Sequence, residues 1–267
     1  MSKDHEILVV DDEQVIIDAV IKICSIDNYN VDSAINVTTA IEKISKNFYP
    51  IIVCDIMMPD GNGFQILDEL RSRHVESAVI MMTGYSTVEN AVNSLYKGAV
   101  DFIPKPFTVD ELLNSIFRAN KYLNILKRVR ESFNRKQSTE LIYVNCPSRY
   151  SRLGYSSWLC KESEGSVLVG VSDLFLKTIE SLKEIEFMKP EEELMQGIAC
   201  ATLVSVDDRS HKILSPVSGS IVEINQELKQ NASLIEKDPF FQGWLYRVIP
   251  EDLEYESKNL IPCSSDR

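Results

Sequence analysis

Three acidic residues and one lysine in the first half of the chain have the chemistry that phosphoryl transfer needs. Asp11 and Asp12 follow the apolar run EILVV, Asp55 follows PIIVC, and Lys105 follows VDFIP. Carboxylates that converge raise one another's pKa unless a cation compensates them. A divalent ion that prefers oxygen ligands, such as Mg²⁺, would supply that charge. A carboxylate nucleophile beside a metal ion and a lysine can attack a phosphoryl group and form an acyl phosphate.

The elements predicted around these residues explain why they should meet. Over residues 6–123, five short β-rich runs alternate with five stretches of helical apolar spacing. This alternation predicts an α/β, flavodoxin-like fold, a doubly wound parallel sheet with strand order 2-1-3-4-5. The carboxyl ends of strands 1 and 3 are then neighbours, which brings Asp11, Asp12 and Asp55 together. Thr83 ends the fourth strand and adds a hydroxyl group to the same edge.

Four motifs in this region resemble the receiver domain of two-component response regulators, over about residues 4–120. They are VVDDE, DIMMPDGNG, MTGYST and IPKPF. The resemblance implies that Asp55 is the phosphoacceptor, and that Asp11, Asp12, Asp55 and the backbone carbonyl of Met57 hold Mg²⁺. It also implies a sensor histidine kinase or a phosphotransfer protein as partner.

The same resemblance assigns further roles at the rim of the sheet. Thr83 and Lys105 would contact the phosphoryl oxygens, and Lys105–Pro106 is expected to be a cis peptide. Thr83 and Phe102 would form the switch that reports phosphorylation on the surface of the fourth helix, fifth strand and fifth helix. Simple packing of Phe102 on its strand is the alternative. Cys54 is expected to be a buried strand residue.

A basic segment separates two acidic regions of the chain. Residues 1–117 hold 8 basic and 18 acidic side chains, a net of −10; residues 118–140 hold 7 and 2, a net of +5; the remainder has a net of −7. Apolar residues continue from the fifth helix at heptad-like spacing, which favours a homodimer through this linker helix and the surface described above. A lone helix packed on its own chain is the alternative. The seam consists of Ile116, Ala119, Leu123, Leu126 and Phe133.

The second half changes to short β-rich runs separated by turn residues, which predicts an all-β domain. GSVLVGVSD, SPVSGSIVEIN and KDPFFQGWL resemble the H-protein of the glycine cleavage system, over about residues 155–255. That family is a lipoyl carrier with a flattened β-sandwich. Trp244, in the last of these motifs, is expected to anchor the core.

The resemblance fails at the residue that would carry the cofactor. The family's lipoyl-lysine lies at a hairpin tip, seven residues before the Ser of SPVSG, which gives Asp208 here; matching its Ser-Val context gives Asp207 instead. Because a carboxylate cannot form the amide that lipoate requires, no lipoate is expected. Lys212, a possible displaced acceptor, should lie in the following strand rather than at the tip. His211 is expected to be a surface turn residue.

Several classes of protein do not fit the composition. No apolar run approaches the roughly 18 residues of a membrane span, and the N-terminus has no apolar signal core, so a cytoplasmic protein is expected. The six cysteines show no CxxC spacing, which argues against a zinc site or a disulfide framework. The acidic second half and the lack of a helix-turn-helix pattern argue against DNA binding.

Together these features predict a receiver domain at residues 1–120, a helical linker at 121–140 and an H-protein-like domain at 141–267. We expect a signalling protein rather than an enzyme, capable of autophosphorylation from small phosphodonors and of autodephosphorylation. The favoured output is binding to an unidentified protein partner. A phospho-regulated lipoyl carrier linked to glycine cleavage and a DNA-binding regulator are the alternatives.

Overall fold

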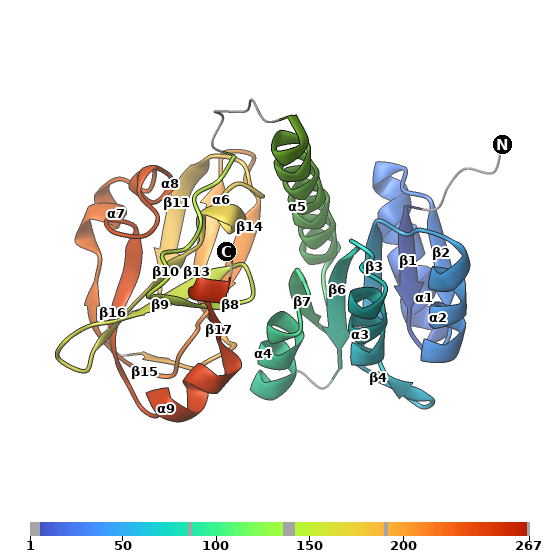
Figure 1. Cartoon of the computed structure of the whole chain (residues 1–267), viewed down its shortest axis with the longest axis horizontal. Helices are drawn as coiled ribbons and strands as arrows, with labels where there is room; N and C mark the ends of the chain where they lie inside the picture. Colours follow the sequence, from blue (N-terminus) through green and yellow to red (C-terminus); the bar gives the residue numbers. More distant parts are fainter. Residues whose placement is uncertain (1–5, 85–86, 136–141, 190–191, 266–267) are drawn as a thin grey trace. The chain divides into compact units, whose positions relative to one another are not determined.

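A computed structural model describes residues 6–84, 87–135, 142–189 and 192–265, without the side chains of residues 133–135. The chain divides into two compact units, residues 1–90 with 97–127 and residues 91–96 with 128–267. Each fold is described by itself (Figure 1). The predicted domain boundaries at residues 120 and 140 stay predictions, and linker residues 136–140 lie outside the described residues.

The first fold is a five-stranded parallel sheet in the order β2-β1-β3-β6-β7, which confirms the flavodoxin-like prediction. Strands β1, β3 and β6 are buried along their whole length, as expected of a sheet covered on both faces. The elements in chain order are β1 (Ile7–Val10), α1 (Gln14–Cys24), β2 (Val31–Ala34), α2 (Val37–Lys46), β3 (Ile51–Asp55), β4 (Met57–Met58), β5 (Gly61–Asn62), α3 (Phe64–Ser72), β6 (Ala78–Thr83), α4 (Val88–Tyr96), β7 (Asp101–Pro104) and α5 (Val109–Arg135).

Helix α5 is the longest helix described, at 27 residues, and it runs on past the predicted end of the first domain (Figure 1). This continuation confirms the helical part of the linker prediction. The pairing of two such helices stays a prediction. Among the described residues, none of the helices combines the length and the apolar character that crossing a membrane would require.

The second fold is built from a seven-stranded sheet in the order β12-β15-β16-β10-β9-β8-β17 and a three-stranded sheet in the order β11-β13-β14. All of their pairings are antiparallel, which agrees with the predicted all-β domain. Short helices interrupt the strands. The elements are β8 (Ser151–Leu153), β9 (Ser157–Lys161), β10 (Val167–Val171), α6 (Asp173–Leu176), β11 (Leu182–Phe187), β12 (Glu193–Leu194), β13 (Ala199–Ser205), β14 (Ser210–Leu214), β15 (Gly219–Ile224), α7 (Gln226–Gln230), α8 (Leu234–Lys237), β16 (Trp244–Pro250), α9 (Leu253–Glu256) and β17 (Ile261–Pro262).

Trp158 is the fully buried tryptophan of this second core, whereas Trp244, which was expected to anchor it, is only half-buried and packs against the same cluster. Trp158 is fully buried, and its indole N–H donates to the carbonyl of Val171 at 3.0 Å. Its ring lies over Gly170, where an added Cβ would be only 2.3 Å from a ring carbon. Trp244 is half-buried, with the guanidinium of Arg247 5.3 Å from its ring centroid. All six cysteines are free thiols, as expected.

Candidate functional site

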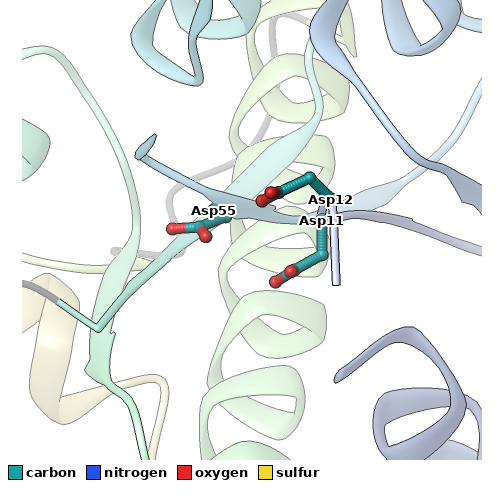
Figure 2. Close-up of side chains that lie close together, drawn as sticks. All are labelled: Asp11, Asp12 and Asp55. Carbon is teal, nitrogen blue, oxygen red and sulfur yellow. The ribbon is translucent and has the colours of Figure 1, made fainter. Parts of the chain in front are cut away.

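Three carboxylates converge at the carboxyl ends of β1 and β3, as the strand order predicted. Asp11, Asp12 and Asp55 each offer an oxygen atom, and these oxygens lie within 4.8 Å of one another (Figure 2). Strands β1 and β3 are parallel neighbours, with Val10 paired to Cys54, so both strands end at the same edge of the sheet. Asp11 and Asp55 are buried, whereas Asp12 is exposed.

Lys105 brings the only cation that contacts this cluster among the described residues. Its Nζ lies 2.6 Å from Asp11 Oδ2 and 2.8 Å from Asp55 Oδ2, and 3.9 Å from Glu13 Oε1. Burial lowers the pKa of Lys105, but its hydrogen bonds to Asp11 and Asp55 outweigh burial and raise that pKa above the ordinary value. The lysine is therefore held in its charged form beside Asp55.

The backbone around Lys105 fixes where its side chain emerges. Its N–H donates to the carbonyl of Thr83 at 2.8 Å, and the Lys105–Pro106 peptide is cis, as expected. Thr83 ends β6, is fully buried and lies on the strand next to Asp55, which pairs with Met82. Thr83 thus ends β6 and Lys105 follows the adjacent strand β7, at the edge of the sheet that carries the acidic cluster. Their contacts with a phosphoryl group stay predictions.

The loop after Asp55 is tightly constrained. The N–H of Met57 donates to Asp55 Oδ1 at 3.3 Å, while the N–H of Gly63 donates to the carbonyl of Ile56 at 2.9 Å. A Cβ built on Gly63 would lie 2.0 Å from the carbonyl oxygen of Asp55 and 2.9 Å from Cys54 Sγ. Only glycine leaves room for the backbone to pass here, so this residue is required by the close approach to Asp55.

Cys54 is fully buried, as predicted for a strand residue. Its thiol donates to the carbonyl of Asp55 at 3.0 Å, and burial raises its pKa well above the ordinary value. A thiol in that state is a weak nucleophile. The chemistry of this edge therefore rests on the carboxylates.

Phe102 is half-buried and packs against the core cluster that includes strands β1 and β3. Its N–H donates to the Asp101 carboxylate at 2.9 Å. This arrangement is compatible with the switch role and equally with simple packing on β7. Both readings of Phe102 stay open.

The acidic cluster fits a divalent ion with oxygen ligands. Burial raises the pKa of Asp11 despite the hydrogen bond from Lys105, which means that its charged form is incompletely compensated. A cation that accepts carboxylate ligands would relieve this imbalance. Asp11, Asp12 and Asp55 would hold Mg²⁺, with the carbonyl of Met57 as the further predicted ligand.

The second position of interest is the hairpin between β13 and β14. Val206, Asp207 and Asp208 form its exposed three-residue tip, closed by a hydrogen bond from the N–H of Asp208 to the carbonyl of Ser205 at 2.9 Å. Asp208 adopts a left-handed conformation, with φ of 59°, which an aspartate tolerates better than most residues. Both candidate lipoyl positions are therefore at the tip, and both are aspartates.

Each aspartate of this tip has a basic partner. Asp208 Oδ1 lies 2.6 Å from Nζ of Lys183 on strand β11, and Asp207 Oδ2 lies 3.2 Å from Nε of Arg209. Asp207 also accepts a hydrogen bond from the hydroxyl of Ser205. The tip is an ion-paired turn.

His211 is buried, so the prediction of a surface turn residue was wrong. Strand β14 begins at Ser210, and its alternation turns the next side chain inward; His211 is 1% exposed, and its Nε2 lies 3.3 Å from Ser205 Oγ. Lys212 is exposed within β14 and pairs with Thr202 of β13, as predicted for a residue away from the tip.

Sequence reasoning missed two residues, one that contacts the hairpin tip and one in the loop after Asp55. Lys183 lies more than twenty positions from the hairpin in the sequence, and only the pairing of β11 with β13 brings it to the tip. Asp60 lies within the DIMMPDGNG motif, but its partners on α2 come from 22 and 23 residues earlier. The one local sequence signal for the partners of Asp60 was the helix-capping pattern at Asn36-Val37-Thr38, which marks the start of α2.

Comparison with known families finds two matches that occupy different parts of the chain. Residues 7–117 match the response regulator receiver domain, and residues 149–265 match the glycine cleavage H-protein. The glycine cleavage system H protein of Shewanella halifaxensis (strain HAW-EB4) is 31% identical over 117 residues, which cover 44% of this chain and 89% of that protein.

Relatives of the first half are regulatory proteins. Regulatory protein AtoC of Escherichia coli (strain K12) is 33% identical over 130 residues, which cover 49% of this chain and 28% of AtoC. A receiver domain structure (CheY-like) from Methanospirillum hungatei JF-1 is 33% identical, covers 43% of this chain and 91% of that chain, and has a TM-score of 0.40. The chain spans 28% of AtoC and 55% of the next relative, transcriptional regulatory protein DltR of Streptococcus agalactiae, so it shares only part of each.

Proposed function

Because the chain belongs to the glycine cleavage H-protein family over residues 149–265 and to the response regulator receiver family over residues 7–117, we propose that it is a two-component response regulator with an H-protein-like output domain. A sensor histidine kinase or a phosphotransfer protein phosphorylates Asp55. The observation that carries the proposal is the convergence of Asp11, Asp12, Asp55 and Lys105 at one edge of the sheet.

The chemistry follows from the position of Asp55. One carboxylate oxygen attacks the phosphorus of a phosphohistidine or of a small phosphodonor such as acetyl phosphate; the new P–O bond forms as the bond to the leaving group breaks, and the leaving group takes the electron pair. Mg²⁺, when bound, offsets charge on the phosphoryl oxygens. Lys105, 2.8 Å from Asp55, supplies a second positive charge, and Thr83, at the end of the neighbouring strand, would contact the same group.

The signal then passes to the second domain. We place the switch at Thr83 and Phe102, and the responding surface on α4, β7 and α5, with homodimerisation through that surface and α5 as one way of transmitting it. The half-buried state of Phe102, on the strand next to the one that ends in Thr83, is compatible with this role.

The output is protein binding without lipoate. Asp207 and Asp208 occupy the tip where the family carries its lysine, and a carboxylate offers no amine for acylation. The pairing of both acids with Arg209 and Lys183 gives the tip a defined charge pattern, which supports a surface for a protein partner. The net charge of −7 on residues 141–267 opposes a DNA-binding output.

One observation favours the phospho-regulated lipoyl carrier as a second candidate. The Lys183 amine lies beside the tip, although it comes from β11 and is ion-paired with Asp208. In this reading Lys183, rather than a hairpin residue, would receive the acyl group.

Intact-protein mass spectrometry tests both readings. The chain would be produced together with lipoate and lipoate ligase, then treated with acetyl phosphate and Mg²⁺. We expect a phosphoryl adduct that Asp55→Asn abolishes, and no lipoyl adduct. A lipoyl adduct that disappears in Lys183→Arg, but persists in Lys212→Arg, would establish the carrier instead. Absence of a phosphoryl adduct on the wild type, from acetyl phosphate and from a histidine kinase alike, would contradict the receiver function.

A further inference from the structure

Asp60 lies at the turn of the small β4–β5 hairpin, which immediately follows the phosphoacceptor. Strand β4 begins at Met57, the residue whose carbonyl is the predicted metal ligand, and it pairs with β5 through Met57 and Asn62. The turn projects Asp60 toward the start of helix α2. The hairpin thus has the candidate metal ligand at its base and a carboxylate at its tip.

The Asp60 carboxylate binds the first residues of α2. Oδ1 accepts from the N–H of Val37 at 3.2 Å, and Oδ2 accepts from both the N–H and the hydroxyl of Thr38 at 3.1 Å. The first N–H groups of a helix have no partner within the helix and favour an anion. An added Cβ on Gly61 would lie 3.5 Å from a methyl carbon of Val37, so the hairpin also packs against this helix end.

The segment between β2 and α2, whose end Asp60 binds, also contacts Asp11 of the acidic cluster. The N–H of Asp11 donates to the carbonyl of Ala34 at 3.1 Å, at the end of β2. Residues 34–38 therefore hold two loops at once, the one that carries Asp11 and the one that carries Asp55 and Met57. The distance between these loops determines the size of the space available to a metal ion.

Helix α2 does not depend on Asp60 for its own cap. The side chain of Asn36 accepts from the N–H of Thr39 at 2.8 Å, and the backbone carbonyl of Asn36 accepts from the N–H of Ala40 at 3.1 Å. Loss of Asp60 would leave that cap in place and would release mainly the β4–β5 hairpin. The contact is thus more consequential for the loop than for the helix.

We propose that Asp60 is a positioning residue for the metal site, which tethers the β4–β5 hairpin to α2 and so holds the Met57 carbonyl and Asp55 in register with Asp11. This inference rests on the proposed function, because it assumes that the acidic cluster binds Mg²⁺. Asp60 itself touches neither the ion nor the phosphoryl group. Its effect appears in Mg²⁺ affinity.

Calorimetric titration of the full chain with Mg²⁺, in the absence of any phosphodonor, measures that affinity directly. Groups that position metal ligands typically change the affinity by about tenfold or more when they are removed. We expect Asp60→Ala to weaken Mg²⁺ binding by about tenfold and Asp60→Asn to have a smaller effect, since one amide oxygen can still accept. In acetyl phosphate assays, the Mg²⁺ concentration for half-maximal rate should rise, while the rate at saturating Mg²⁺ stays within about twofold.

Two further variants keep the test decisive. Asp68→Ala removes another exposed carboxylate, on α3, where it pairs with Lys97, and should leave Mg²⁺ affinity unchanged. Thr38→Ala removes only the hydroxyl contact and should shift the affinity in the same direction as Asp60→Ala, even if the latter fails to fold.

An unchanged affinity in Asp60→Ala, or an equal loss in Asp68→Ala, would overturn the proposal and leave Asp60 a purely structural contact. If the wild type binds Mg²⁺ but accepts no phosphoryl group, the proposed function fails while the role of Asp60 is still decided by the titration. A wild type that binds no Mg²⁺ would overturn the role of Asp60.

Discussion

The Lys183 amine lies 2.6 Å from a carboxylate oxygen of Asp208, which joins strand β11 to the tip of the β13–β14 hairpin. Pairing between β11 and β13 is irregular between Leu182 and Glu184, and Lys183 is the residue at this irregularity. Bulges of this kind redirect a side chain. Both side chains are more than half exposed, so the pair contributes little to stability. Its consequence is the placement of charge. The tip carries an aspartate where the resembled family carries a lysine, and the amine of Lys183 lies on the neighbouring strand.

Restoring a lysine at the tip should restore acylation. Asp207 lies in the middle of the exposed turn with an ordinary backbone conformation, whereas Asp208 has φ of 59° and would strain a lysine. We expect Asp207→Lys to gain a lipoyl adduct when produced with lipoate and its ligase, and Asp208→Lys to gain less. Intact mass, followed by peptide mapping, gives the answer.

The wild type serves as the control for this gain and should carry no lipoyl group. Failure of both lysine variants to be acylated would show that the ligase rejects this hairpin for reasons beyond the missing amine. Preferential acylation at position 208 would instead support the alignment counted from SPVSG.

Substitution of Gly63 should damage the site around Asp55. In Gly63→Ala the new Cβ would meet the carbonyl oxygen of Asp55 at 2.0 Å, so the backbone of one of the two must move. We expect a loss of about 1–3 kcal/mol in the free energy of unfolding, together with slower phosphorylation by acetyl phosphate. Urea denaturation and phosphorylation time courses measure the two effects.

Gly61→Ala is the matched control, because it lies in the same loop and its added Cβ would meet mainly the flexible Gln65 side chain, at 3.3 Å. This variant should retain nearly all of both properties. Equal behaviour of the two alanine variants would mean that the loop adapts and that the close approach to Asp55 is unimportant.

The core of the second domain allows a test by paired substitutions. Gly170→Ala would place a Cβ 2.3 Å from the ring of Trp158, and overpacking of this kind costs about 1–3 kcal/mol. In a Trp158→Leu background the same alanine should cost much less, since the ring is gone. A double-mutant cycle by urea denaturation measures this coupling; strictly additive effects would show that the ring is not what excludes the alanine.

The receiver site could be predicted from the sequence because its determinants are local. Each residue follows a short apolar strand, and a parallel sheet gathers the carboxyl ends of its strands at one edge, so the order of the strands placed Asp11, Asp55 and Lys105 together. Asp60 was missed because its partners on α2 depend on how the hairpin folds back, which no spacing encodes.

The second domain was harder to read at the level of individual residues. His211 follows the polar tip closely in the sequence, yet strand β14 begins one residue earlier, at Ser210, and the alternation turns this imidazole inward. Trp158 is more deeply buried than Trp244 because Gly170, on the paired strand, leaves space for its ring. The position of Lys183 depends on the pairing of β11, which joins segments far apart in the sequence.

Tyr49 should give the receiver a defined alkaline pH dependence. It is buried, and its hydroxyl donates to Asp32 Oδ2 at 2.6 Å; burial and this carboxylate raise its pKa to about 12. A pKa raised in the folded state means that the stabilisation is fully present below the unfolded value of 10 and is lost as the pH rises from 10 toward 12. Tyr49→Phe should therefore be less stable than the wild type by about 2 kcal/mol at pH 8, and the difference should shrink above pH 10. Urea denaturation across this range measures it, with exposed Tyr255→Phe as the control. A difference that stays constant to pH 12 would show that the buried hydroxyl ionises no later than in the unfolded chain.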